Sequence, residues 1–177
     1  STAEAISVGL VESGTVFFQY GSSMFYYYCV DRYVDDYVSA NGNGSLKGGK
    51  EFTIPGIFCI GDGTNAAGTL TRWVRDTFYE EELKKERAGG ENAYAVMARE
   101  AAEVEAGSEG LIILPYIYGE RSPIQDAKAS GMLFGLKGTH TRKQINRAAL
   151  EAVGYSTLQH MILFDEMTFR PKSIITG

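Results

Sequence analysis

The sequence predicts a layered α/β domain in which a mixed sheet is flanked by helices. Two segments near the start, residues 15–20 and 24–30, are rich in β-branched and aromatic side chains, as strands are. From about residue 57 onward, helical and strand patterns alternate, without an internal repeat. Strands followed by alternating helices and strands indicate one sheet with helices packed on it.

Composition limits the class of protein. A chain of 177 residues, 44% hydrophobic and 12% aromatic, is long enough to bury one sizeable core. The net charge of −5 and the lack of a basic patch argue against a nucleic-acid partner. No apolar run approaches the roughly 18 residues that a membrane span needs, and the start lacks the basic region of a signal peptide. These features predict a cytoplasmic protein without a membrane partner.

The first half of the chain is expected to supply most strands. Residues 15–20 and 24–30 should be joined by the short turn at residues 21–23. Residues 41–49 are rich in glycine and asparagine, which predicts a mobile loop or a hairpin tip. A short buried strand is expected at residues 57–60, ending at the Gly-Asp-Gly of residues 61–63.

Three helices are expected next. The first spans about residues 66–78 with Leu70, Trp73 and Val74 on its inner face, Trp73 being a core residue. Residues 79–87 place acids ahead of bases, which suits a solvated surface helix, with a partner site as the alternative.

Residues 93–106 form the third helix, and a strand should follow at residues 111–114.

Residues 131–151 combine a strand with a helix. The apolar run 132–136 predicts a buried strand, and Thr139 or Thr141 should cap the following helix. One face of that helix is small and apolar, so the helix should lie close on a sheet. That face consists of Ile145, Ala148, Ala149 and Ala152, and the expected solvated side chains are Arg142, Lys143 and Arg147. A second helical segment is expected at residues 155–168 and a last strand at 173–176.

Potentially reactive side chains are few. Cys29 and Cys59 lie in apolar strand-like runs, which favours buried free thiols; a disulfide or redox pair is the alternative. His140 and His160 lack acidic partners at ligand spacing, so neither is expected to be a metal ligand or a base. The aspartates between residues 31 and 36 are better explained as a solvated loop, and no metal site is predicted.

The segment 131–151 also carries a family pattern. Small, apolar, polar and acidic residues stand in this segment at fixed distances from one another along the chain. The constrained positions are Gly131, Leu133, Gly135, Leu136, Gln144, Ile145, Ala148, Ala149, Leu150 and Glu151. This pattern resembles the second signature of the FGGY family of carbohydrate kinases. The pattern identifies a family without making each of its residues functional, because packing alone explains any one of them.

The resemblance covers residues 1–177 and implies a fold, an activity and partners. The implied fold is the ribonuclease H-like domain of actin-like ATPases and sugar kinases, here the C-terminal domain of an FGGY kinase. The implied activity is transfer of the ATP γ-phosphoryl group to a hydroxyl of a ketopentose or related sugar, most like xylulokinases. ATP and the Mg²⁺ that accompanies it are the implied cofactors, and the full-length protein is expected to form homo-oligomers.

The resemblance also implies nucleotide-binding residues. Gly21 and Ser22 resemble the family's phosphate turn, although an ordinary hairpin turn explains the same residues without it. Gly68 and Thr69 open the helix that lies against the nucleotide, and Arg72 takes the place of a nucleotide-contacting side chain. A helix N-terminus beside glycines is a natural anion site.

A substrate contact and a structural loop follow from the same resemblance. Phe25 holds the position that packs on the sugar, with a core or edge-strand aromatic as the alternative. Residues 114–123 resemble a proline- and aromatic-rich loop that braces the cleft, although Gln125 stands where the family usually has tryptophan. We expect this loop to be architectural.

The ends of the chain lead to a further expectation. Residues 1–11 look like a helix without a cap, and Thr176 and Gly177 resemble the start of the adenosine-binding loop. The chain is therefore expected to be a domain truncated at both ends, without the N-terminal sugar-binding domain, which would be its partner. The catalytic Asp would lie directly before Ser1, so residues 1–177 alone are predicted to be inactive.

Other functions stay open at this point. The substrate could instead be ribulose, gluconate or glycerol within the same family. A non-catalytic actin-like module that binds nucleotide is the rival from another class, because Ser22 replaces the family's usual threonine.

Overall fold

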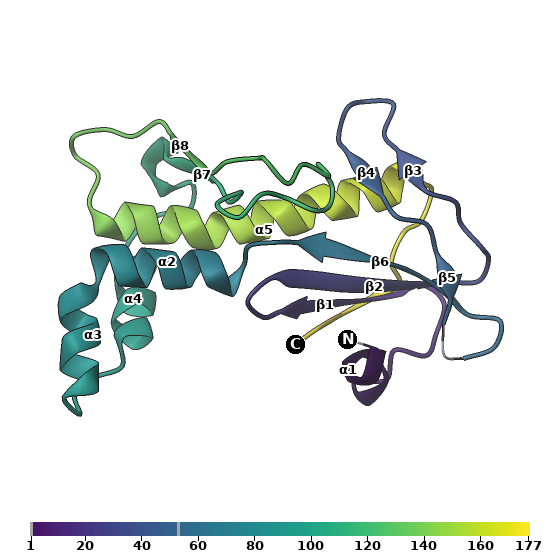
Figure 1. Ribbon diagram of the computed structural model, residues 1–177, viewed down its shortest axis with the longest axis horizontal. Coiled ribbons are helices and arrows are strands. Elements are labelled where there is room, and N and C mark those ends of the chain that lie inside the picture. The colour runs from purple at the N-terminus through teal and green to yellow at the C-terminus, as the bar shows by residue number, and fades with distance from the viewer. Residues whose placement is uncertain (1, 53) are drawn as a thin grey trace.

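The computed structural model describes residues 2–52 and 54–177. Its centre is a five-stranded sheet in the order β5-β6-β2-β1-β9. The long helix α5 crosses one face of this sheet and the short helix α1 lies on the other (Figure 1). Helices α2, α3 and α4 gather at one end of the sheet, and the β3–β4 hairpin lies at the other end (Figure 1).

Six helical segments and nine strands make up the described part of the chain. The helices are α1 (Thr2–Ser7), α2 (Gly68–Phe78), α3 (Glu80–Arg87), α4 (Ala93–Ala102), the 3-10 turn η1 (Ser108–Gly110) and α5 (Arg142–Glu166). The strands are β1 (Thr15–Tyr20), β2 (Met24–Val30), β3 (Tyr37–Val38), β4 (Ser45–Leu46), β5 (Lys50–Glu51), β6 (Phe58–Thr64), β7 (Ile112–Leu114), β8 (Met132–Phe134) and β9 (Ser173–Thr176).

The central sheet is mixed, as predicted. Strands β1 and β2 are antiparallel across the turn at residues 21–23, and β6 pairs antiparallel with β2. Strand β9 instead runs parallel to β1. A parallel partner needs a crossover connection, and α5 is the last element of that crossover. Among the described residues, no helix combines the length and apolar character that crossing a membrane requires.

The two faces of β2 belong to different parts of the core. Met24, Tyr26 and Tyr28 pack against Leu163 and Phe164 of α5. The residues between them point the opposite way, because side chains alternate along a strand. On that second face the buried residues are Ala5, Leu10, Phe17, Cys29 and Cys59. Both cysteines are buried free thiols, as the sequence predicted.

Strand β6 is longer than predicted. The sequence indicated a strand that ends before Gly61, whereas β6 continues through Gly61 and Gly63 to Thr64. A side chain at Gly61 would place its Cβ 2.9 Å from the ring of Tyr27, and one at Gly63 would collide with the carbonyl of Met24. These glycines therefore permit close strand pairing, which a sequence pattern cannot distinguish from a turn.

Helix α5 differs from the prediction in extent and in partner. It is one helix of 25 residues that continues through Gly154, and the two separate segments expected from the sequence do not exist. Its small face lies away from the central sheet: Ala148, Ala149 and Ala152 are buried among α2, Met97 of α4 and Ile113 of β7, so the sheet that this face contacts is the β7–β8 ribbon. Small residues suit a close helix–helix contact as well as a helix–sheet contact.

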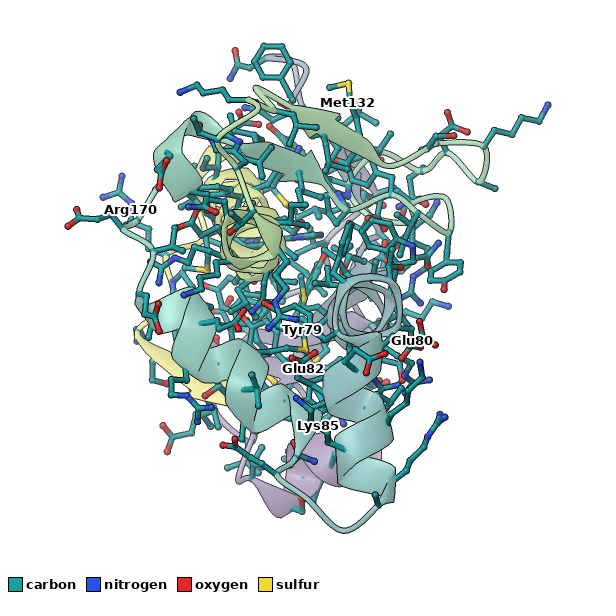
Figure 2. All side chains as sticks on the ribbon, turned by 90° about the vertical axis from the view of Figure 1, so that its left-hand side faces the viewer. Tyr79, Glu80, Glu82, Lys85, Met132 and Arg170 are labelled. Atoms are coloured by element: carbon teal, nitrogen blue, oxygen red, sulfur yellow. The ribbon has the colours of Figure 1, made fainter. Side chains whose placement is uncertain are left out.

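The predicted cap of α5 is confirmed, whereas the predicted burial of strand β8 is wrong. Thr141 caps α5 in a capping box with Gln144, which settles the choice between the two threonines. Strand β8 forms as expected but is exposed, with Met132 and Phe134 on the surface, so the predicted burial is wrong (Figure 2). An apolar run predicts a strand but not whether another element will bury that strand. Among the described residues, β8 pairs with β7 alone.

Arg142 is not the solvated side chain that the sequence suggested. Its guanidinium donates to both carboxylate oxygens of Glu82, at 3.0 and 3.1 Å, and to Glu100 at 2.6 and 3.1 Å. It also lies 4.2 Å above the ring of Tyr79. Tyr79 and Glu82 occupy the space between the helices (Figure 2). The hydrogen bonds with Glu100 and Glu82 raise the pKa of Arg142, and the bonds from Arg142 lower the pKa of Glu82. This cluster joins the first turn of α5 to α3 and α4.

The β3–β4 hairpin confirms the hairpin alternative for the glycine-rich segment. Its tip is held by Glu166 at the end of α5, which accepts from Tyr37 Oη, Asn41 Nδ2 and Asn43 Nδ2. Hydrogen bonds from Asn41, Ser39 and Asn43 lower the pKa of Glu166 to about 2. The ionised carboxylate is therefore the form that the folded hairpin favours.

We predict that Arg142→Met destabilises the protein by about 2 kcal/mol, because it leaves two largely buried carboxylates without their cation. The side chains of Glu82 and Glu100 are only 14% exposed, whereas that of Arg142 is 33% exposed. This partial exposure places the value between those of surface and buried ion pairs. Urea unfolding monitored by circular dichroism measures the change.

Lys143→Met is the matched control for Arg142→Met. The neighbouring Lys143 pairs with Glu103, but the two side chains are 39% and 55% exposed. Its loss should cost less than about 1 kcal/mol. Equal effects of the two substitutions would contradict the role assigned to Arg142.

We predict a pH-dependent stability contribution from Glu166. Its pKa is about 2 in the folded state and about 4.3 in an unfolded chain. A depressed folded pKa gives a stabilisation that is present above about pH 4.3 and is lost as the pH falls toward 2. Glu166→Gln keeps the side-chain shape without the charge, so its stability deficit relative to wild type should shrink over that window.

Unfolding curves measured from pH 7 to pH 2.5 test this. Glu105→Gln serves as control, because the exposed Glu105 side chain has no hydrogen-bond partner among the described residues. A Glu166→Gln deficit that stays constant down to pH 2.5 would refute the prediction.

Candidate functional site

Five elements meet at one edge of the central sheet. Strands β1 and β9 are parallel, so their carboxyl ends lie side by side, and the turn at residues 21–23 follows β1 directly. Gly177 extends this pairing, with Tyr20 N donating to Gly177 O at 2.8 Å and Gly177 N donating to Phe18 O at 3.0 Å. Strand β6 ends at the same edge, since Thr64 pairs with Met24, and α2 begins four residues later. Edges at the carboxyl ends of strands are common ligand sites in α/β proteins.

The turn and the start of α2 are joined by four hydrogen bonds. Gly68 N donates to Gly21 O at 2.9 Å, and Ala67 N donates to Ser22 O at 3.1 Å. Thr69 donates to Ser22 O twice, from its amide and from its hydroxyl, each at 2.9 Å. Four predicted nucleotide-binding residues, from segments more than forty positions apart, therefore lie in direct contact.

These bonds change which groups are free to hold an anion. The first amides of α2 are already donated to carbonyl oxygens of the turn, so the helix N-terminus does not present them to a ligand as the sequence had suggested. In the described structure, the amides and hydroxyls of Ser22 and Ser23 have no hydrogen-bond partner. Ser22 is exposed and Ser23 is half-buried. The turn itself, and not the helix, offers the donors.

Helical spacing places Arg72 on the side of α2 that meets the turn. It lies on α2 one helical turn after Gly68, so both residues lie on the same side of the helix. Its side chain is exposed and forms no ion pair with any of the described residues. An unpaired guanidinium beside free hydroxyl and amide donors is suited to phosphate oxygens.

Gly68 is required by the approach of α2 to the turn. A Cβ on Gly68 would lie 2.6 Å from Gly21 O, a backbone atom that cannot rotate away. A Cβ on Gly21 would have Ser23 O as its nearest neighbour at 3.8 Å, which is ordinary contact. Of the two glycines that the sequence singled out, only Gly68 is therefore needed for the packing of the described chain.

The loop at residues 114–123 supports the end of β6, as expected for an architectural element. Glu120 Oε1 accepts from Asn65 N at 2.8 Å, and Ser122 N donates to Gly63 O at 3.2 Å. Glu120 is buried, and burial raises the pKa of its carboxyl above the ordinary value. The end of β6 and the segment that follows it are thus also held by this loop.

Two buried polar residues near this loop, Asp62 and His160, were given no structural role by the sequence. Asp62 accepts from Gln125 Nε2 at 3.1 Å, and His160 Nε2 lies 3.0 Å from Ser122 Oγ. Burial lowers the pKa of His160, which keeps the ring neutral. His160 therefore braces the loop. The alternation of β6 and the helical spacing of α5 would have placed both residues inward, but no pattern named their partners.

No cluster of three or more metal-ligating side chains occurs among the described residues. The prediction that Mg²⁺ arrives bound to ATP requires no such cluster, and it stays a prediction. Free hydroxyls, amides and Arg72 would fit the phosphate groups of a nucleotide, and nothing in this set would hold an ion alone.

Phe25 lies next to the turn but on a different surface. It follows Met24 in β2 and faces away from α5, with its ring 4.7 Å from that of Tyr27. Both rings line a cavity of about 620 Å³. The remaining lining residues are Asp36, Lys47, Gly48, Lys50, Glu51, Phe52, Cys59 and Gly61. Aromatic faces beside charged and polar groups are suited to a polyhydroxylated ligand.

A family model matches most of the chain. The FGGY family of carbohydrate kinases, C-terminal domain, matches residues 20–176. The matched region contains the turn, the start of α2 and the loop at residues 114–123.

Known proteins similar to the chain are sugar kinases. A gluconokinase of Bacillus subtilis is 38% identical over 97 residues, which is 55% of this chain and 19% of that protein. A xylulose kinase of Lactococcus lactis is 36% identical over 105 residues, 59% of this chain and 19% of that protein. The crystal structure of xylulose kinase from Rhodospirillum rubrum superposes with a TM-score of 0.78 at 27% identity, covering 99% of this chain and 32% of that one. The chain thus spans about a fifth of the curated relatives and a third of the solved structure.

We predict that Gly68→Ala destabilises the protein by about 1–3 kcal/mol, because the new methyl group pushes α2 away from the Gly21 carbonyl. Gly154→Ala is the control. It lies within α5, where an added Cβ would meet no atom within 4 Å, and should stabilise by about 0.5–1 kcal/mol. Urea unfolding of both variants measures these opposite signs. If Gly68→Ala were as stable as wild type, the assigned close contact would be wrong.

Proposed function

The chain belongs to the FGGY family of carbohydrate kinases, and on that premise we propose that the protein containing it phosphorylates a small sugar. The reaction would transfer the γ-phosphoryl group of ATP to a hydroxyl of a ketopentose or a related sugar. Because the chain spans only a fifth of its curated relatives, this activity is proposed for a protein in which a sugar-binding domain accompanies it. The isolated residues 1–177 are predicted to be inactive.

The observation that supports the proposal most is the contact between the turn at residues 21–23 and the start of α2. Gly21, Ser22, Gly68 and Thr69 are held together by hydrogen bonds. The free donors of Ser22 and Ser23 and the unpaired Arg72 lie around this contact. Such a group of donors is suited to the oxygens of a chain of phosphates.

Each of these residues would have a defined part in the reaction. The turn donors would hold the phosphate oxygens, and Arg72 would balance the negative charge that spreads over them during transfer. When bound, ATP with Mg²⁺ supplies the phosphoryl group and the metal charge. The fixed contact through Gly68 would keep the donors in place, so that they need not reorganise during the reaction. A general base is expected from an Asp preceding Ser1.

Phe25 would contribute to sugar binding from the cavity beside the turn. Its ring and that of Tyr27 offer apolar faces for the carbon-bound hydrogens of a sugar, and Asp36 and Lys50 offer polar groups for hydroxyls. Gluconate is a second candidate substrate. It is favoured by the 38% identity to a gluconokinase, and the two lysines lining this cavity would suit its carboxylate.

Release of ADP by the full-length protein tests the function. We expect ATP turnover to be stimulated by one member of a panel of xylulose, ribulose, gluconate, glycerol and erythritol. Stimulation by xylulose or ribulose would support the ketopentose proposal, and stimulation by gluconate alone would favour the sugar acid.

Two controls make the outcome decisive. Nucleotide binding is measured on the same preparation, and a preparation lacking sugar gives the basal turnover. Intact nucleotide binding without stimulation by any of these compounds would overturn the kinase proposal and favour a non-catalytic nucleotide-binding module.

A further inference from the structure

Cys29 and Cys59 form a pair of thiols across two neighbouring strands. They are directly opposite in the antiparallel register of β2 and β6. Their sulfur atoms lie 3.1 Å apart and share a hydrogen bond in which either can be the donor. Cys29 is fully buried and Cys59 is 7% exposed. Neither residue takes part in the proposed kinase reaction.

The register of the strands places this pair in a geometry that a disulfide can adopt. Opposite residues in antiparallel strands have Cα atoms about 4.5–5.5 Å apart. Disulfides span Cα separations of about 4.4–6.8 Å with an S–S bond of about 2.05 Å. Bond formation therefore needs the two sulfurs to approach by about 1 Å, which side-chain rotation supplies while the strands remain paired.

The cavity beside the sheet gives one of the sulfurs a route to small molecules. Cys59 lines the same cavity of about 620 Å³ as Phe25 and Tyr27, whereas Cys29 is fully buried and is not part of its lining. The shared hydrogen bond lowers the pKa of Cys29 and raises that of Cys59, because two adjacent sulfurs do not both carry a negative charge. These directions place the first negative charge on Cys29, which can therefore take the proton of Cys59 when Cys59, the sulfur that lines the cavity, attacks a small molecule.

We propose that Cys29 and Cys59 form a reversible dithiol–disulfide site, oxidised by a hydroperoxide that reaches Cys59 through this cavity. The evidence for this site is the strand register, the distance between the sulfurs and the exposure of one of them. It does not depend on the kinase proposal, because neither sulfur lies at the phosphate turn.

The oxidation is balanced in two steps. Cys59 Sγ attacks one oxygen of hydrogen peroxide as its proton passes to Cys29 Sγ, the O–O bond breaks, and the hydroxide that leaves takes up a proton to become water, giving a sulfenic acid at Cys59. Cys29 Sγ then attacks Cys59 Sγ, the S–O bond breaks, and a second water leaves. The two thiols lose two electrons and two protons in total, and the peroxide is reduced to two molecules of water. A dithiol reductant reverses the reaction by exchange.

Peptide mapping of the full-length protein tests the proposal. The protein is treated with hydrogen peroxide, free thiols are alkylated, and the sample is digested with trypsin without reduction. Cleavage after Lys50 and Arg72 isolates Cys59 in residues 51–72, and Cys29 lies in the peptide that ends at Arg32. We expect these two peptides to appear linked, with a mass two hydrogens below their sum, and to separate after treatment with dithiothreitol.

The wild-type protein supplies a control that does not depend on a variant. Linkage should form faster in folded protein than in protein unfolded by urea, because only the folded strands hold the sulfurs together. Equal rates in the two states would overturn the proposal. So would alkylation of both cysteines after peroxide treatment, over-oxidation of Cys59 without linkage, or linkage between two separate chains.

Two serine variants distinguish the roles of the sulfurs. In Cys59→Ser, the buried Cys29 should remain alkylatable after unfolding, because no thiol remains on the wall of the cavity for the peroxide to meet. In Cys29→Ser, Cys59 should proceed to sulfinic acid, because no second thiol resolves the sulfenic acid. Oxidation of Cys29 in the first variant at the wild-type rate would contradict the route through the cavity.

Discussion

The contact between the first turn of α2 and the turn at residues 21–23 is the constraint on which the candidate site depends. The bonds use the first amides of a helix to satisfy two carbonyls of the turn that joins β1 to β2. The donors that remain are those of Ser22 and Ser23, which a hairpin alone would not hold in a fixed position. Gly68 has no side chain to separate α2 from the turn, so a larger residue at this position would require α2 to shift.

Helix α5 makes this contact possible by joining two differently packed halves. Its first half meets α2 and α4 through alanines, which allow close approach, and Arg142 fixes α3 and α4 to its start. Its second half meets the aromatic face of β2 through Phe164. One rigid helix therefore sets the position of α2 relative to the sheet, and the contact with the turn follows from that position. Packing on the two halves, and not local helix propensity, explains why the helix continues through Gly154.

Local chemistry made much of this predictable. The ends of β1, β2 and β9 agree with the sequence patterns, because those strands are short runs of β-branched and aromatic residues bounded by turns. The mistakes concern long-range packing. The glycines of β6 resembled a turn, although they admit Tyr27 and Met24, and Arg142 looked solvated because its partners lie on α3 and α4. For the site, the sequence named Gly21, Ser22, Gly68, Thr69 and Arg72, but it gave no sign that the α2 amides would be consumed by the turn.

The two faces of β2 carry different kinds of side chain. Side chains facing α5 are buried aromatics that fix the helix, and those facing the other way include Phe25, Tyr27 and Cys29. Strand β6 repeats this arrangement, with Cys59 and Gly61 on the cavity side. The proposed sugar contact and the proposed thiol site therefore share one cavity wall, although they rest on unrelated observations. A bond between the sulfurs would fix β2 to β6 at the end of the strands opposite to the turn, since Val30 pairs with Phe58 there and Met24 pairs with Thr64 at the turn. The turn at residues 21–23 can thus keep its geometry while the two sulfurs beside the cavity are oxidised or reduced.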